Sequence, residues 1–124
     1  MKDGDTQRTY DLSDRLLEFA ASVIWFVPKL EKSTTGRYLA NQLMRAAASS
    51  GANYEEACGA ESKADFIHKM QIVLKELRES LFWLKLIKKT NLIDVPELTH
   101  MLSEADELTK IIAKSILTAR QPTR

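Results

Sequence analysis

Residues 42–66 decide the fold of this chain, because they join a helix of small residues to the start of a long apolar helix. They read Gln-Leu-Met-Arg-Ala-Ala-Ala-Ser-Ser-Gly-Ala-Asn-Tyr-Glu-Glu-Ala-Cys-Gly-Ala-Glu-Ser-Lys-Ala-Asp-Phe. Alanine, serine and glycine at helical spacing let a neighbouring backbone approach closely. Asn53 falls on the predicted buried side, so we expect it to be a structural polar residue, hydrogen-bonded to a backbone carbonyl or a carboxylate.

Outside this stretch, apolar residues recur every three or four positions, and this periodicity predicts further helices. The first helix ends near Pro28, the second covers about residues 36–57, and the third runs from residue 62 to about 90. Pro96 opens the fourth, because proline is well tolerated in the first turn of a helix. No stretch alternates polar and apolar residues as a strand would.

Short connections between four helices predict an all-α fold, an up-and-down antiparallel four-helix bundle. We expect the bundle to span residues 9–118, with flexible tails at 1–8 and 119–124. At 124 residues, the chain is long enough for one hydrophobic core.

Four residues are expected to shape the helix ends and contacts. Ser62 has an acidic residue three positions later, which predicts an N-cap for the third helix. Gly59 is available as a left-handed C-cap of the second helix, and Asn91 ends the third. Gly51 lies inside the second helix, where glycine is unfavourable by about 1 kcal/mol relative to alanine, so we expect it to serve close packing.

Composition indicates an ordinary soluble protein, with 44% hydrophobic and 28% charged residues. Eighteen Lys and Arg against seventeen Asp and Glu leave a formal charge of +1, so any basic binding surface has to be local or built by assembly. A single cysteine, Cys58, excludes an intramolecular disulfide and suits a reducing compartment. The polar N-terminus and the absence of a long apolar run predict a cytoplasmic protein without a membrane partner.

Catalytic and metal-binding patterns are weak. Glu97 and His100 form one Glu-x-x-His motif of the kind found in di-metal bundles, but helical periodicity turns both away from the apolar stripe. Cys58 has no histidine nearby in sequence, and no glycine-rich phosphate loop is present. We therefore expect no enzymatic activity, no catalytic residues, and no metal or cofactor.

Apolar residues surround the second half of the third helix, which predicts contact with another copy of the chain. The expected interface residues on this helix are Ile72, Trp83 and Leu86. Trp25 points away from the core stripe of the first helix, and it is either a subunit contact or a partly covered residue at the helix edge. Glu79 lies among the interface residues and is expected to be a structural polar residue, paired with an arginine of a neighbouring subunit.

Basic residues are spread over the second and third helices. Two interpretations remain open. These residues form either an ordinary solvent-exposed face or a patch that, repeated on each subunit of a symmetric oligomer, makes a phosphate-binding surface. The candidates for contacting nucleic acid are Arg37, Arg45, Lys63 and Lys69. Arg45 and Arg37 are also the candidates for pairing with Glu79.

Over about residues 10–117 the chain resembles the small four-helix-bundle proteins encoded by intervening sequences of bacterial 23S ribosomal RNA genes. The residues that carry this resemblance are Pro28-Lys29, Gln42-Leu43, Arg45-Ala46-Ala47, Ser49, Asn53, Glu56, Ser62, Asp65-Phe66, Glu79 and Leu84. Two positions depart from the family pattern. Ala57 replaces a common glycine, and Met44 replaces a common second arginine, which weakens the case for strong anion binding.

The resemblance implies a closed homo-oligomer, typically a pentamer of bundles. A related member acts as an accessory protein of diversity-generating retroelements, where it binds a reverse transcriptase and nucleic acid. The leading hypothesis is therefore a non-enzymatic, ring-forming bundle that binds RNA or DNA through a surface formed by assembly. The alternative is a protein-binding adaptor or scaffold that does not bind nucleic acid.

Overall fold

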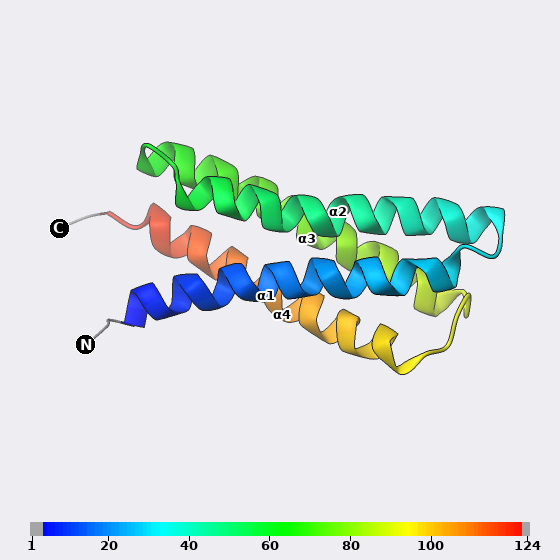
Figure 1. Cartoon of the computed structure of the whole chain (residues 1–124). Helices are drawn as coiled ribbons and strands as arrows, with labels where there is room; N and C mark the ends of the chain where they lie inside the picture. The colour runs from blue at the N-terminus through cyan, green and yellow to red at the C-terminus, as the bar shows by residue number, and fades with distance from the viewer. Residues whose placement is uncertain (1–3, 123–124) are drawn as a thin grey trace.

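The structure is a computed structural model that describes the backbone of residues 4–122 and the side chains of residues 12–122. Its described part is an up-and-down antiparallel bundle of four long helices, which confirms the predicted fold (Figure 1). The elements are α1 (Gly4–Phe26), the short 3-10 helix η1 (Val27–Leu30), α2 (Thr34–Cys58), α3 (Lys63–Lys89) and α4 (Pro96–Arg120).

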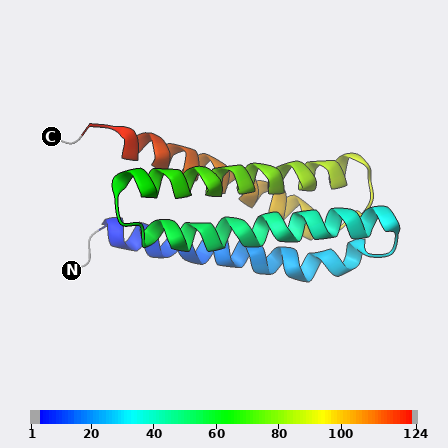
Figure 2. The ribbon, with the colours of Figure 1, turned by 90° about the horizontal axis from the view of Figure 1, so that it is seen from above.

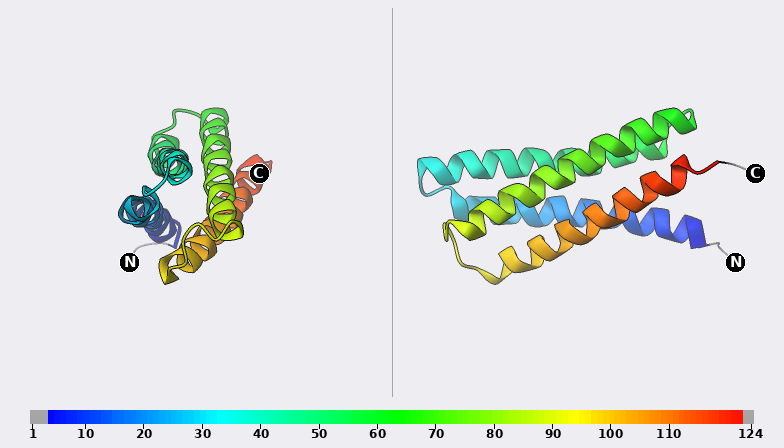
Figure 3. Two further views of the ribbon diagram at one scale, coloured as in Figure 1. Left: turned by 90° about the vertical axis from the view of Figure 1, so that its right-hand side faces the viewer. Right: turned by 180° about the vertical axis from the view of Figure 1, so that it is seen from behind.

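The four helices contact one another unequally. α2 and α3 run side by side over their whole length and share the most extensive contact (Figure 2). Viewed along the bundle, α1 and α3 occupy diagonally opposite corners, and their described backbones do not approach each other closely (Figure 3). The contact between α1 and α4 is the smallest of those between neighbouring long helices, because α4 crosses the bundle at an angle.

Helix ends follow the residues that predicted them. The Ser62 side chain accepts a hydrogen bond from the Asp65 amide at 3.0 Å, and Pro96 opens α4, so both predicted starts are confirmed. Asn91 has a φ of 52°, the left-handed conformation that ends many helices. The amide of Leu92 donates to the Ile87 carbonyl at 3.3 Å and so completes the turn after α3.

Two predictions about glycine are wrong. Gly59 caps α2 with a φ of −98°, outside the left-handed region, because its amide donates back to the Glu56 carbonyl in a tight turn. A Cβ atom on Gly51 would lie 3.7 Å from the Leu16 carbonyl oxygen, which is ordinary contact, so packing does not require glycine there. Gly36 is the glycine that a close approach demands, since its Cβ would lie 1.7 Å from the Leu30 carbonyl oxygen.

The core is built from the inward face of every long helix, and its largest fully buried side chains are Leu16, Phe19, Val23, Phe26, Leu43, Met70, Leu77, Leu84, Ile87, Met101, Leu108 and Ile112. α3 lies between α2 and α4, so its flanks are covered as well as its inner face. The half-buried Leu74, Leu81 and Trp83 pack against the core from these flanks. Much of the apolar excess of α3 is therefore accommodated within one chain, and a partner subunit is not needed to explain it.

The ends of the bundle differ slightly from the predicted boundaries. α1 begins at Gly4 rather than near residue 9, and α4 extends to Arg120 rather than 118. Residues 1–3 and 123–124, which belong to the predicted tails, lie outside the described residues. Within the described part, no helix has both the length and the hydrophobicity needed to cross a membrane.

Candidate functional site

Three of the polar residues that the sequence singled out, Arg45, Lys69 and Glu79, lie along the α2–α3 seam, where the outer edges of these helices meet. Arg45 of α2 forms an ion pair with Glu79 of α3, and its Nη1 also lies 3.4 Å from Glu76 Oε1. Further along, Lys69 Nζ lies 2.8 Å from Glu56 Oε1. The hydrogen bond from Lys69 lowers the pKa of Glu56, and the one to Glu79 raises the pKa of Arg45.

This arrangement corrects the expectation that Glu79 pairs with an arginine of a neighbouring subunit. Its partner is Arg45 of the same chain, because the antiparallel packing of α2 and α3 brings these two positions together. Arg45 and Lys69 are thus both engaged by carboxylates of their own chain. Arg37 instead donates to Thr34 Oγ1 at 3.3 Å, and Lys63 donates to the Gln121 carbonyl at 3.0 Å.

Asn53 is half-buried on α2, and its amide group is satisfied locally. Its Nδ2 donates to the Ser49 carbonyl oxygen at 2.9 Å and to Ser49 Oγ at 3.0 Å. The expected carbonyl partner is present, but it belongs to the same helix. The hydrogen bonds of Asn53 therefore stay within its own helix and do not connect α2 to a neighbour.

Glu76 is the polar residue that the sequence reasoning missed. It is 8% exposed, the most buried charged residue of the described chain, and it faces Arg45 across the seam. A signal was present, since Glu76 lies directly beside the core residue Leu77 and three positions after Val73. The side chain of buried Ser80 donates to the Glu76 backbone carbonyl at 2.9 Å.

The apolar residues predicted for an oligomer interface divide into two groups. Ile72, Trp83 and Leu86 are half-buried on α3. The Trp83 ring meets Tyr38 edge to face, with centroids 6.0 Å apart, and its buried Nε1 has no hydrogen-bond partner among the described residues. Trp25, in contrast, is 72% exposed on α1.

Trp25 does not stand alone on the surface. Leu17 and Ile24 are also exposed, at 68% and 49%, and they share the outward face of α1 with it. We call these three residues the α1 stripe. The sequence reasoning identified only Trp25. The spacing of seven between Leu17 and Ile24, both outside the core stripe, was the signal that would have revealed the rest.

A groove of about 470 Å³ lies beside the α1 stripe, between the end of α1 and the start of α4. Its lining residues are Ser22, Trp25, Phe26, Lys29, Pro96, Glu97, His100 and Met101. Lys29 and Glu97 form an ion pair at its edge, and the hydrogen bond from Lys29 lowers the pKa of Glu97. We call this feature the α1–α4 groove.

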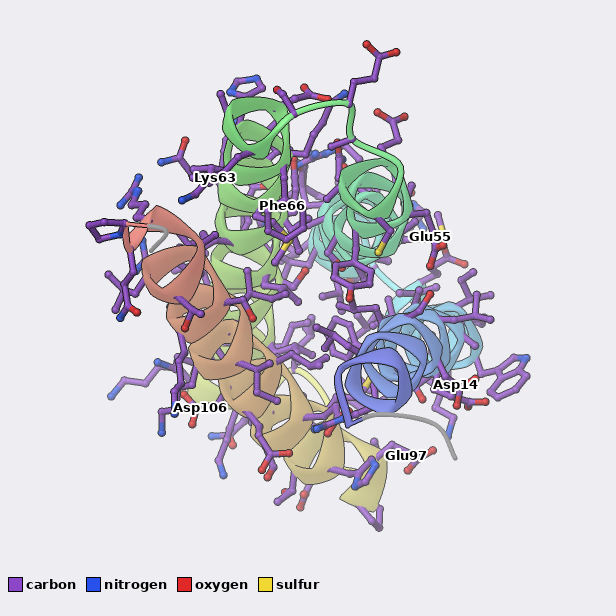
Figure 4. The ribbon with its side chains drawn as sticks, turned by 90° about the vertical axis from the view of Figure 1, so that its left-hand side faces the viewer. Asp14, Glu55, Lys63, Phe66, Glu97 and Asp106 are labelled. Atoms are coloured by element: carbon purple, nitrogen blue, oxygen red, sulfur yellow. The ribbon has the colours of Figure 1, made fainter. Side chains whose placement is uncertain are left out.

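The groove contains both members of the Glu-x-x-His motif, but they do not form a metal centre. Glu97 and His100 are exposed, as the periodicity predicted. Figure 4 shows Glu97 at the outer edge of the bundle. Across the described part of the chain, no group of three or more His, Cys, Asp or Glu side chains is placed to hold a metal ion.

A bidentate ion pair connects α1 to α4 outside the groove. Arg15 of α1 reaches Glu104 of α4 through Nε at 3.0 Å and Nη2 at 2.9 Å, and it also binds Glu107. The hydrogen bond to Glu104 is the largest cause of the raised pKa of the Arg15 guanidinium. This pair ties α1 to α4 where the two helices share little other contact.

Comparison with known proteins agrees with the fold and with the family that the sequence resembles. Residues 8–114 match the family described as 23S rRNA-intervening sequence protein. A solved structure of a protein of unknown function from the S23 ribosomal protein family of Bacteroides thetaiotaomicron is 32% identical, with a TM-score of 0.78. The match covers 85% of this chain and 97% of that one. No curated protein matches the chain. The chain therefore belongs to the 23S rRNA-intervening sequence protein family.

Proposed function

We propose that this chain is a non-enzymatic structural protein that assembles with copies of itself into a closed ring, a pentamer, and that the assembled particle binds RNA or DNA. The observation that carries the proposal is the α1 stripe. Large apolar side chains that are half to three-quarters exposed and gathered on one helix face are typical of interaction surfaces. Aromatic residues such as Trp25 are enriched at such surfaces.

The shape of the surface favours a ring over a two-fold dimer. A ring needs two different surfaces on each chain, because each copy uses one surface to contact the copy before it and the other to contact the copy after it. The chain presents two exposed apolar side chains, Leu17 and Ile24, and a separate, concave and mainly apolar surface in the α1–α4 groove, which Trp25 helps to line. We propose that Leu17 and Ile24 of one copy enter the groove of the next.

The chemistry of the described side chains supports binding rather than catalysis. The carboxylates of the α2–α3 seam are neutralised by basic residues of the same chain. Desolvation is the largest cause of a raised pKa for the Cys58 thiol, so at neutral pH it is mainly protonated and a weak nucleophile. Neither arrangement resembles a side chain prepared to attack a substrate.

Light scattering tests the assembly. We expect the wild-type chain to have the mass of a closed oligomer at micromolar concentration, and the double variant Leu17→Glu with Ile24→Glu to have the mass of a monomer. Leu117→Glu is the matched control, because Leu117 is 62% exposed on α4 and lies outside both proposed surfaces. A monomeric wild type, or a double variant that keeps the oligomeric mass, would show that the proposal is wrong.

The proposed binding of nucleic acid is tested by measuring how much structured RNA the assembled protein retains at increasing salt concentrations. Phosphate contacts release counterions, so binding should weaken steeply as salt rises. If the assembled protein does not bind RNA even at low salt, the adaptor hypothesis replaces this one, and the apolar surfaces would then serve a protein partner such as a reverse transcriptase.

A further inference from the structure

A row of cations without ion-pair partners among the described residues lies on α3, on the side that faces solvent. Lys75, Arg78, Lys85 and Lys89 follow one another at intervals of three, seven and four residues, and Phe82 fills the middle of the row. All five are exposed, and the helical repeat places them on one face. We call this row the α3 basic stripe.

Within the described part of the chain, no carboxylate neutralises this row. None of its four cations lies within 4.0 Å of a carboxylate oxygen among the described residues. The two acidic residues in this part of the helix, Glu76 and Glu79, turn toward α2 and bind Arg45. The fold thus separates charges that alternate in the sequence, with the anions in the α2–α3 seam and the cations in solvent.

Phe82 gives the row a second property. Its side chain is 56% exposed, although its neighbours in the row are all charged. It meets Trp83 at a centroid distance of 5.2 Å and an interplanar angle of 72°. A contact of this edge-to-face kind covers at most one face of the Phe82 ring, so Trp83 leaves at least one face open for stacking.

Building on the proposed function, we propose that the α3 basic stripe binds a single strand of RNA or DNA, with the four cations contacting phosphates along the strand and a base stacked on Phe82. A positive row interrupted by an aromatic ring is the combination that holds single strands without sequence preference. Fourteen residues separate Lys75 from Lys89, which is about 21 Å along a helix. A stacked strand carries one phosphate per 3.4 Å or so, and the stripe therefore spans about six nucleotides.

The location of the stripe is compatible with assembly. α1 and α3 lie at diagonally opposite corners of the bundle, so the α1 stripe and the α3 basic stripe face different directions (Figure 4). A ring formed through α1 and the α1–α4 groove leaves the solvent face of α3 uncovered. Each copy then contributes one stripe to the particle.

Fluorescence anisotropy with a short labelled oligouridine tests the inference. For four phosphate contacts, the logarithm of the binding constant should fall against the logarithm of salt concentration with a slope of about −3 per stripe. The double variant Arg78→Gln with Lys85→Gln should lower the steepness of this slope by about 1.4 and weaken binding. The matched control is Lys32→Gln with Lys114→Gln, which removes the same charge from exposed positions outside α3 and should bind as the wild type does.

Phe82→Leu tests the stacking contact, because it keeps an apolar side chain and removes the aromatic face. We expect binding of oligouridine to weaken roughly five- to a hundred-fold with an unchanged salt slope. A duplex RNA of the same length should bind the wild type more weakly than the single strand does, since its bases are not free to stack on the ring. Circular dichroism spectra matching those of the wild type would establish that each variant is folded.

Each remaining outcome overturns one specific statement. If the wild type binds RNA but both double variants behave alike, nucleic-acid binding stands and the α3 basic stripe is the wrong site. A wild type that binds no RNA at low salt removes the proposed binding function and the inference with it. If Phe82→Leu has no effect, or the duplex binds best, the stripe does not select single strands. A poly-glutamate peptide that competes as well as RNA would assign the stripe to an acidic protein partner.

Discussion

The two sides of α3 differ in what surrounds their charges. On the α2–α3 seam, Glu76, Glu79 and Lys69 each meet an oppositely charged side chain of α2. On the solvent side, the cations of the α3 basic stripe have no such partner among the described residues. Basic residues therefore cannot be ranked as ligand-binding candidates by counting charge along a helix, because the neighbouring helix decides which of them remain available.

Replacing two adjacent aromatic residues should show the largest difference between the two sides. Trp83→Ala removes a half-buried ring that packs against the core and Tyr38, and it should lower the free energy of unfolding by about 2–3 kcal/mol. Phe82→Ala removes a ring that is 56% exposed and should lower it by less than about 1 kcal/mol. Urea denaturation followed by circular dichroism, at one fixed protein concentration, measures both. Equal losses would contradict the assignment of Trp83 to the interior and Phe82 to the surface.

Removing a cation should matter on the seam and not on the solvent side. Arg45→Met leaves the nearly buried Glu76 without its cation, so the variant should be less stable than the wild type. Lys75→Met removes a cation that has no ion-pair partner among the described residues, and stability should change little. The same urea experiment compares them. A stable Arg45→Met variant would mean that the Arg45 ion pairs do not contribute to folding.

The stability contributed by the Lys69–Glu56 ion pair of the α2–α3 seam should depend on pH, and this effect should be smaller than that of removing Arg45. Lys69 lowers the pKa of Glu56 below its ordinary value of 4.5, so the pair stabilises the folded chain above that value and the contribution is lost as the pH falls through the lowered pKa. A carbon-13 NMR titration should place the Glu56 midpoint below 4.5 in the wild type and closer to 4.5 in Lys69→Gln. If the midpoint is the same in both proteins, Lys69 does not interact with Glu56 in solution.

Reversing one charge on the solvent side should have the smallest effect, and it should be favourable. Lys85 and Lys89 lie one turn apart, where like charges repel each other and a Glu–Lys pair attracts. Lys85→Glu should therefore raise the free energy of unfolding by a few tenths of a kcal/mol, about 0.5 at most. Thermal unfolding at low salt measures this change. A loss of stability would show that Lys85 already has a partner in the folded protein.

The sequence predicted the bundle well because helix formation depends mostly on local patterns. The starts of α3 and α4 and the turn at Asn91 rely on neighbouring residues only, so Ser62 and Pro96 identified them correctly. Predictions that depended on contacts between helices were less successful. The partner of Glu79 was sought in another subunit, and Glu76 was not noticed as a buried carboxylate, because both outcomes depend on Arg45 reaching across from α2.

The α1 stripe and the α3 basic stripe were predicted only in part, because exposure and charge pairing also depend on how the helices pack. Trp25 was identified from its direction, but Leu17 and Ile24 were not, although all three are exposed on the same helix. Two of the four predicted basic candidates, Arg45 and Lys69, have carboxylate partners, while the unpaired row on α3 was counted as diluted by acidic neighbours. Acidic residues do lie between these cations in the sequence, but in the folded chain Glu76 and Glu79 face α2 and not the solvent side.

The amino-acid sequence is sufficient to establish four helices, their order and the residues that face the core, since these follow from a period of 3.6 residues and from capping at helix ends. The family resemblance seen in the sequence is confirmed by the match of residues 8–114 to that family. The tertiary structure decided which charges are paired, which apolar residues remain exposed, and where α1 and α4 leave a groove. These properties depend on distances between side chains far apart in the chain, and only the packing of one helix against another sets those distances.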